Sequence, residues 1–366
     1  MLFLVDLPAP VHGMSTINQA LLTRLQSQNL SISVINTVPS YVANWFHSRW
    51  WLPAKILHTL LCLVQLIAYC ITHPKDVVYR SVNGGTGQWF DLLYFSVCRL
   101  FFMQIYIHHH SFAYLHQHSK RYALINAIAG KKAVHIALGD AMKQRLVELY
   151  DIPEENTRVQ SNLAFFDFKS DIQQPKQTES LVIGHLANLT FDKGLDTFLD
   201  VCYQLHRFGV PFEACIAGPA TDQKVKQAIE KALNDIPSVR YIGPLYNEEK
   251  RQFYQRLDAF VFPTKYVNEA EPLVLYEAAT HGALLIGTQR GCMPQVINKL
   301  GGHSFNEHQH LSHDIAQLLG TCLKNGDFSS NQRLGRTQQF ESSKSQALNS
   351  LASLIGEFKN SYVSGS

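Results

Sequence analysis

Short apolar runs alternate with longer amphipathic segments along the whole chain. The runs at residues 2–5, 181–186 and 259–262 are bounded by glycine, proline or polar residues and have the length of buried parallel strands. Further strands are predicted at 31–36, 77–80, 104–107, 134–138, 158–162, 213–217, 239–245 and 283–287. Helical periodicity follows most of these strands. The pattern therefore predicts an α/β fold with doubly wound sheets.

A polar stretch rich in Gln, Lys, Ser and Thr divides the chain at residues 168–180 and shows no apolar period. We expect a first domain over 1–167, this stretch as the linker, and a second domain over 181–337. Residues 338–366 carry apolar side chains at helical spacing, and we expect that helix to pack back on the first domain. A chain of 366 residues that is 46% hydrophobic and 17% charged can form two such cores.

Cysteine usage and charge bear on location. Seven cysteines, an odd number without CxxC spacing, favour reduced thiols in a cytoplasm over disulfides or a zinc site. Residues 1–165 hold 13 Lys and Arg against 8 Asp and Glu, whereas the remainder holds 19 against 21. The first half is therefore expected to meet an anionic surface or a lipid-linked substrate. No signal peptide is evident, so we expect a cytoplasmic protein, peripheral on the inner membrane through weak contact.

An apolar run at 56–71 follows three tryptophans that lie between residues 45 and 51. About 16 residues are fewer than the roughly 20 needed to span a bilayer, so the run is interpreted as a buried or interfacial helix. Arg49 and Lys55 beside the tryptophans leave membrane contact open. Core packing is the favoured interpretation.

Two glutamates mark the segment after the strand at 259–262. Glu269 falls in an acidic loop, and Glu277 falls in the following helix. Pro272 suits the first helical position, and Gly282 suits a left-handed helix end. Loops at the carboxyl ends of parallel strands, and the free N–H groups of helix starts, bind anionic ligands. The segment therefore predicts a ligand site, with two solvated surface acids as the alternative.

Two other loops carry candidate chemistry. Lys193 and Gly194 precede a helix of the second half, so an ammonium group would lie beside an anion held at the helix start. Gly13 follows the first strand, where the lack of a side chain lets backbone approach a ligand closely. A plain turn at Gly13 is equally compatible.

Histidines end the strand that begins at residue 104, in the run His108, His109 and His110. A metal site is disfavoured, because no carboxylate or cysteine completes it and neighbouring strand residues face opposite sides. Residues 108 and 110 share one face, and His110 begins the loop. No G-x-G-x-x-G follows the first strand of either half, which argues against a dinucleotide dehydrogenase.

Taken in order, these features resemble glycosyltransferase family 4, the retaining GT-B glycosyltransferases of bacterial cell-surface polysaccharide synthesis. The resemblance is carried by Glu269 and Glu277 at Glu-x7-Glu spacing, by Gly282, by the Lys193-Gly194 pair, by His110 and by Gly13. It implies two Rossmann-like domains that face each other across a cleft.

The resemblance also implies roles. Glu277 would bind the ribose hydroxyls of a nucleotide sugar, and Glu269 would lie by the transferred sugar. Lys193 would stabilise the departing diphosphate, and His110, with His109 in reserve, would hydrogen-bond the donor sugar. The catalytic residues expected are thus His110, Glu269 and Lys193. The donor-binding residues expected are Gly13, Asn188, Lys193, Gly194, Lys265, Glu269, Ala270, Pro272, Leu273 and Glu277.

One departure bears on activity. Asn188 stands where the family usually has Arg, so Lys193, with Lys265, would carry more of the diphosphate charge. The resemblance implies metal-independent, retaining transfer from a UDP-, GDP- or similar nucleotide sugar to a glycan or lipid-linked acceptor, without a cofactor or nucleic acid. The product would belong to cell-surface polysaccharide or lipopolysaccharide. Two alternatives stay open: a sugar-nucleotide 2-epimerase of GT-B fold, and an inactive homologue that binds nucleotide sugar, which Asn188 supports.

Overall fold

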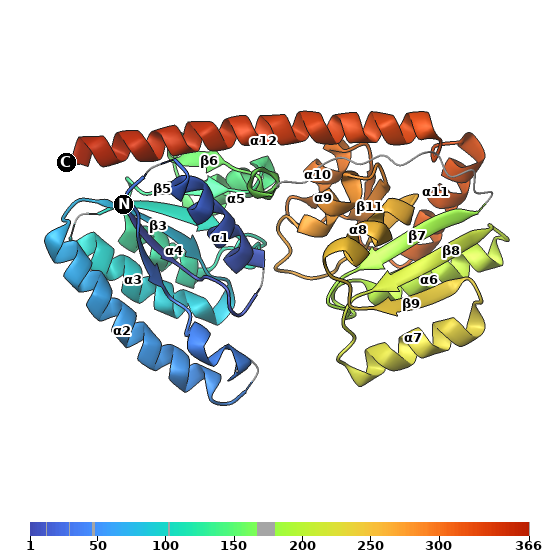
Figure 1. Ribbon diagram of the computed structural model, residues 1–366, viewed down its shortest axis with the longest axis horizontal. Helices are drawn as coiled ribbons and strands as arrows, with labels where there is room; N and C mark the ends of the chain where they lie inside the picture. Colours follow the sequence, from blue (N-terminus) through green and yellow to red (C-terminus); the bar gives the residue numbers. More distant parts are fainter. Residues whose placement is uncertain (12, 29, 46–47, 102, 167–179, 366) are drawn as a thin grey trace. The chain divides into compact units, whose positions relative to one another are not determined.

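The computed structural model describes residues 1–365 apart from 12, 29, 46–47, 102 and 167–179, and most of the expected linker lies outside these residues. The chain forms two compact units. Met1–Phe166 and Gln346–Ser366 make up the first, and Asp167–Ser345 make up the second. Each unit contains one six-stranded parallel sheet flanked by helices (Figure 1). The α/β fold with two doubly wound, Rossmann-like domains is therefore confirmed.

The first sheet has the strand order β2-β1-β3-β4-β5-β6. Its strands are β1 (Leu2–Val5), β2 (Ser33–Asn36), β3 (Val77–Val82), β4 (Gln104–His109), β5 (Val134–Ala137) and β6 (Thr157–Val159). Its helices are α1 (Gly13–Gln26), α2 (Trp51–Thr72), α3 (Gln88–Leu100), α4 (Lys120–Ala129) and α5 (Asp140–Tyr150). Short 3₁₀ turns occupy η1 (Ser40–Trp45), η2 (Gly85–Gly87), η3 (Glu154–Asn156) and η4 (Asn162–Phe165). β1, β3 and β5 are buried along their whole length, although β3 contains Arg80 and Ser81 and β5 contains His135.

The second sheet has the order β12-β11-β10-β7-β8-β9. Its strands are β7 (Leu181–Leu186), β8 (Phe212–Ala217), β9 (Val239–Gly243), β10 (Ala259–Phe262), β11 (Leu284–Thr288) and β12 (His303–Phe305). Its helices are α6 (Leu195–Arg207), α7 (Gln223–Asp235), α8 (Asn247–Arg256), α9 (Leu273–Ala279), α10 (Met293–Lys299) and α11 (Leu311–Asn325). The sequence did not predict β12, because its three polar or half-buried residues carry no apolar run.

The last helix, α12, covers Ser330–Gly365. In the first unit, the Phe358 ring meets Tyr106 edge-on at 4.8 Å and Tyr79 at 6.3 Å, and Arg158 Nε donates to the Glu357 carboxylate at 2.7 Å. In the second unit, Arg336 Nε donates to the Gly282 carbonyl at 2.8 Å. The C-terminal part of α12 thus completes the core of the first unit.

Helix α2 corrects the sequence-based interpretation. It is 22 residues long, and only 22% of its most apolar window is buried. By length and composition it could cross a membrane, and it is the one helix among the described residues that meets this test. The favoured interpretation of core packing is wrong for most of its surface. Apolar composition alone could not separate the two cases, since the pattern gives no information about what covers the outward face.

Candidate active site

The carboxyl ends of β7 and β10 lie side by side at the point where the strand order of the second sheet reverses. Doubly wound sheets bind ligands at this point, because the loops from the two neighbouring strands lead to opposite faces. The loop after β7 carries Lys193 and Gly194, and the loop after β10 carries Glu269. Two of the sequence-predicted segments therefore meet at one place.

Gly194 fixes how closely these loops approach. Its φ is +84°, and a Cβ atom there would lie 2.2 Å from the Pro263 carbonyl oxygen. Beside it, the Lys265 N–H donates to the Asp192 carbonyl at 2.7 Å. Only glycine tolerates both the left-handed backbone and the contact. The loop after β7 is therefore held against the end of β10.

Lys193 and Glu269 form an ion pair across the two loops, with 2.7 Å between Nζ and Oε2. The Thr264 hydroxyl donates to the same carboxylate oxygen at 3.3 Å, and the Tyr266 ring lies 4.5 Å from the ammonium. The Lys193 side chain is 25% exposed and that of Glu269 10%, so the pair is largely shielded from water while the ammonium stays accessible. A cation suited to a phosphate thus stands beside a carboxylate suited to a hydroxyl or a developing positive charge.

A second glycine shapes the other side of Glu269. Gly291 has φ +54°, and a Cβ atom there would lie 2.3 Å from the Glu269 carbonyl oxygen. The next residue, Cys292, donates its N–H to the Ala270 carbonyl at 2.8 Å. The segment after β11 therefore fixes the backbone of the acidic loop, a contact that the sequence analysis did not predict.

Glu277 lies on α9, as predicted, and its partners come from α8. Lys250 Nζ is 2.6 Å from Oε1, and the Tyr254 hydroxyl donates to Oε2 at 2.9 Å. Burial raises the pKa of Tyr254 well above its usual value, so this hydroxyl stays protonated and donates. Sequence reasoning missed both partners. Their i, i+4 spacing on α8 was the available signal, since it puts a cation and a hydroxyl on one helix face.

The remaining predicted residues of this domain occupy the same loops. Lys265 Nζ pairs with Asp196 Oδ2 at 2.6 Å, and Asn188 is exposed in the loop after β7. Ala270 is buried, and Leu273, half-buried, is the first residue of α9. Pro272 was expected at the first helical position. It is instead the N-cap residue, with the extended backbone ψ of 129°.

Gly13 and His110 belong to the first domain. Gly13 is exposed at the start of α1, and a Cβ atom there would meet nothing within 4 Å, so no described part of the chain requires glycine. His110 directly follows β4, and its ring centroid lies 4.1 Å from that of His108. His108 Nδ1 is 2.5 Å from the Tyr79 hydroxyl. The two histidines share a face, as the alternation along β4 predicted.

His109 points the other way and is enclosed. Its Nδ1 lies 2.8 Å from the Tyr114 hydroxyl, and its Nε2 lies 3.2 Å from His135 Nδ1. Burial lowers the pKa of His109 well below its usual value and lowers that of His135 to about 3, so both rings are neutral at pH 7. His109, the reserve candidate, is therefore fully occupied by the interior of the domain.

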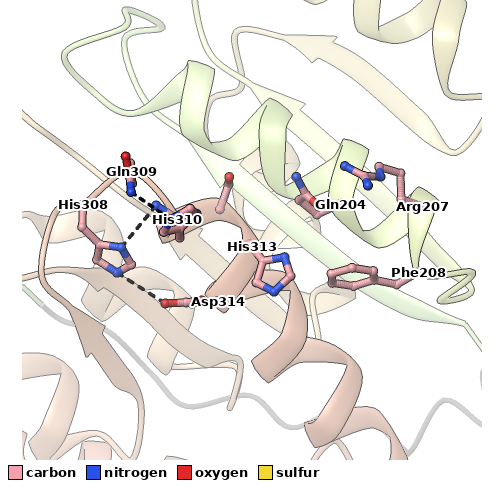
Figure 2. A pocket seen from close by; sticks show the side chains of 9 residues that line it. Gln204, Arg207, Phe208, His308, Gln309, His310, His313 and Asp314 are labelled. Atoms are coloured by element: carbon pink, nitrogen blue, oxygen red, sulfur yellow. Dashed lines mark hydrogen bonds and ion pairs between the residues drawn. The ribbon is translucent and has the colours of Figure 1, made fainter.

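A separate pocket lies between the C-terminal end of α6 and the start of α11 (Figure 2). Phe208 and His313 meet edge-on at 5.3 Å, and His308 Nε2 lies 3.4 Å from Asp314 Oδ2. None of the sequence-predicted site residues lines it. At 1.5 Å per residue, the 13 residues of α6 put about 20 Å between this pocket and Gly194. The pocket is thus distinct from the loops that carry Lys193 and Glu269.

Residues 167–338 match the family model described as "Glycosyl transferases group 1". The matched range contains both loops of the Lys193–Glu269 pair. The chain is a glycosyltransferase. No curated protein matches its sequence.

Solved structures show that the glycosyltransferase has the GT-B fold. A glycosyltransferase from Rickettsia africae aligns with a TM-score of 0.72 at 15% identity, covering 98% of each chain. HepE from Anabaena, solved in complex with UDP, aligns with a TM-score of 0.67 at 15% identity, covering 97% of this chain and 99% of that one. The lipopolysaccharide outer core galactosyltransferase WaaB aligns with a TM-score of 0.62 at 15% identity, covering 94% and 99%.

Proposed function

We propose that the glycosyltransferase is a retaining, metal-independent enzyme of the family 4 type. It transfers a sugar from a nucleoside diphosphate sugar to a glycan or lipid-linked acceptor. The pairing of Lys193 with Glu269 at the switch point of the second sheet is the observation that carries this proposal. In the proposed complex, Lys193 exchanges its contact with Glu269 for the diphosphate, and Glu269 turns to the transferred sugar.

In this proposal, catalysis comes mainly from electrostatic stabilisation of the leaving diphosphate. The leaving diphosphate gains negative charge as the glycosidic bond breaks, and an ammonium in a partly desolvated site stabilises that charge. The N–H groups at the start of α6 add to it, since Gly194 caps this 13-residue helix beside Lys193. Asn188 contributes no charge, so this role rests on Lys193 with support from Lys265. The diphosphate oxygen takes the acceptor proton, which leaves no step that requires a metal.

Glu277 is proposed to accept the two ribose hydroxyls of the donor. Lys250 and Tyr254 orient its carboxylate through bonds of 2.6 and 2.9 Å, so the group is positioned before the donor arrives. An oriented carboxylate loses less freedom on binding, and this favours affinity. His110 in the first domain is the proposed partner of the donor sugar, and Gly13 is proposed to let the backbone approach the substrate.

The similar structures suggest the donor and the pathway. HepE was solved with UDP and with UDP-glucose, so a UDP-sugar is our first choice of donor. WaaB is a lipopolysaccharide outer core galactosyltransferase, which agrees with a role in cell-surface polysaccharide or lipopolysaccharide synthesis. We propose that the glycosyltransferase acts in the cytoplasm, at the inner membrane surface.

The test is product analysis of the full chain with UDP-glucose, UDP-galactose and GDP-mannose, with and without a glycolipid extract as acceptor source. We expect nucleoside diphosphate release that depends on acceptor, a product whose anomeric configuration by NMR equals that of the donor, and full activity in excess EDTA. An inverted product would refute retention, and activity lost to EDTA but restored by magnesium would refute metal independence. Free nucleotide and a 2-epimeric sugar without acceptor would identify the epimerase. Binding without turnover would identify the inactive homologue.

A further inference from the structure

Helix α2 exposes one continuous apolar face. Its inward face is buried through Thr59, Cys62, Leu66 and Cys70. The outward face presents eight large apolar side chains that are between 40% and 66% exposed: Leu52, Ile56, Leu57, Leu60, Leu61, Val64, Ile67 and Ile71. Single exposed apolar residues are ordinary on a monomer, whereas a contiguous face of this size marks an interaction surface.

Several polar side chains of α2 direct hydrogen bonds back to the domain. Lys55 Nζ donates to the Thr37 carbonyl at 2.8 Å, and His58 Nε2 lies 2.9 Å from the Asn36 carbonyl. Near the other end, the Tyr69 hydroxyl donates to Asp76. These bonds fasten both ends of the helix to the domain. A transmembrane orientation would break them and put a lysine in hydrocarbon, so α2 is built to lie along a surface.

Exposed tryptophans with cationic partners lie just before α2 and on the neighbouring helix α3. Trp50, 55% exposed, precedes α2 and carries the Arg49 guanidinium 5.3 Å from its ring centroid. Trp89, 56% exposed, lies on α3 beside α2 and carries Arg121 at 5.2 Å. Tryptophan with a neighbouring cation is typical of the lipid headgroup region, where the ring is half-buried and the charge reaches phosphate.

The charges of this region complement an anionic partner. Residues 7–75 contain no Asp or Glu, and residues 1–139 contain three in all: Asp6, Asp76 and Asp91. Each is largely buried beside a cation, respectively Lys55, the N-terminal ammonium and Arg80. Besides Lys55 and the buried Arg80, the same range holds the cations Arg24, Arg49, Lys75, Arg99, Lys120, Arg121, Lys131 and Lys132. Among the described residues of this range, no exposed acid opposes them.

We propose that the outward face of α2 docks into one leaflet of a membrane that contains anionic phospholipid, with the helix lying in the plane of the interface. The apolar side chains enter the boundary of the acyl chains, and the surrounding Arg and Lys meet the headgroup phosphates. The binding is mainly hydrophobic. The inference does not depend on which sugar is transferred, and its test does not measure turnover.

The first experiment is vesicle flotation of the full chain, with neutral phosphatidylcholine and with phosphatidylcholine containing about a third of phosphatidylglycerol. We expect stronger binding to the anionic vesicles and retention of a substantial part of that binding in about 0.5 M salt, where charge attraction is screened. The triple variant Leu57→Gln, Leu61→Gln and Val64→Gln should weaken binding at least tenfold. The matched control replaces three exposed apolar residues of the second domain: Ile242→Gln, Tyr246→Gln and Leu334→Gln. It should bind as the parent does.

Orientation can be read from intrinsic fluorescence, because all four tryptophans of the chain lie at residues 45–89. We expect bromine near the headgroup end of the acyl chains to quench them and bromine near the bilayer centre to quench them little. Quenching mainly from the centre would refute the in-plane orientation. Binding that high salt abolishes and the triple variant leaves unchanged would refute insertion. A parent dimer in sedimentation that the triple variant makes monomeric, without vesicle binding, would assign the face to a second copy of the chain instead.

Discussion

The two domains share one architecture and place opposite chemistry on it. At the carboxyl edge of the second sheet the strands lead into ion pairs, Lys193 with Glu269 and Lys265 with Asp196. In the first sheet the corresponding end of β4 carries His108 and His109, and burial holds the pKa of each well below its usual value. One site is charged and the other is neutral at pH 7. The sheet determines where a ligand site can form, and the residues after each strand determine what it can bind.

The domains also differ in what they expose. The first carries the apolar face of α2 and a one-sided basic charge, whereas the second has nearly equal numbers of acids and bases. Burial lowers the pKa values of His108, His109 and His135 in the first domain, and the exposed apolar face of α2 is the proposed membrane surface. The proposals thus assign membrane contact to one domain and most of the charge chemistry of transfer to the other. Each prediction below tests that division.

The largest expected effect is acid destabilisation of the first domain. His108 faces Tyr79 and His110, and His109 and His135 face each other and Tyr122. Because the folded pKa of each of the three is lowered, the unfolded chain binds more protons below about pH 6.5, and the free energy of unfolding falls as pH falls from there. For His135, whose pKa in the folded chain is about 3, the free energy of unfolding falls by about 2 kcal/mol between pH 6.5 and 5. In the second domain, burial lowers the pKa of His185 to about 4, so its protonation also lowers the free energy of unfolding.

Hydrogen exchange at pH 7 and pH 5 measures this effect in both domains. The first domain should lose more protection than the second, and His135→Gln should reduce its pH dependence. Earlier opening of the second domain would show that the buried histidines do not set the acid stability.

The sequence predicted the features that local residue patterns mark and missed those that depend on tertiary packing. The buried strands were predicted from short, mainly apolar runs. Lys193, Gly194, Glu269 and Glu277 were predicted because their order and the Glu-x7-Glu spacing resemble a known family. Lys250 and Tyr254 were missed, since their role depends on how α8 packs against α9. The exposed face of α2 was missed for a related reason. Periodicity identifies an apolar helix, but only tertiary packing decides whether another element covers it.

Removing the Lys193 ammonium should have the next largest effect, a loss of kcat. Lys193→Met is expected to lower kcat about 100-fold to 1,000-fold, the usual loss when one group that stabilises transition-state charge is removed. Lys193→Arg keeps the charge and should recover part of the rate, limited by its larger, planar head. Both variants should be compared with the parent in initial rates on the donor that is turned over. Equal losses in the two would indicate that geometry, not charge, is what Lys193 supplies.

A matched pair of glycine substitutions compares the first loops of the two domains. Gly194→Ala should lower the free energy of unfolding by about 2–4 kcal/mol, because φ is +84° and the added Cβ meets the Pro263 carbonyl. Gly13→Ala should leave stability unchanged, since nothing lies within 4 Å. Any loss of activity in Gly13→Ala would then report close approach of a substrate. Denaturant unfolding and initial rates measure both, and equal destabilisation by the two changes would contradict the described loop contacts.

Substitutions of Glu277 and Glu269 should affect different kinetic constants. Glu277→Gln is expected to raise KM for the donor about tenfold to 100-fold, because a charged acceptor contributes roughly 1.5–3 kcal/mol and ribose contacts are equal in ground state and transition state. Glu269→Gln should instead lower kcat with KM little changed, since positive charge develops on the transferred sugar only as the bond breaks. Neither change should unfold the chain, as both side chains retain some exposure, 10% for Glu269 and 20% for Glu277. Steady-state kinetics with varied donor, with circular dichroism as the folding control, separates the two effects. A folded Glu269→Gln enzyme with the parent kcat would remove Glu269 from the reaction centre and leave Lys193 as the only charged group of the pair that acts in transfer.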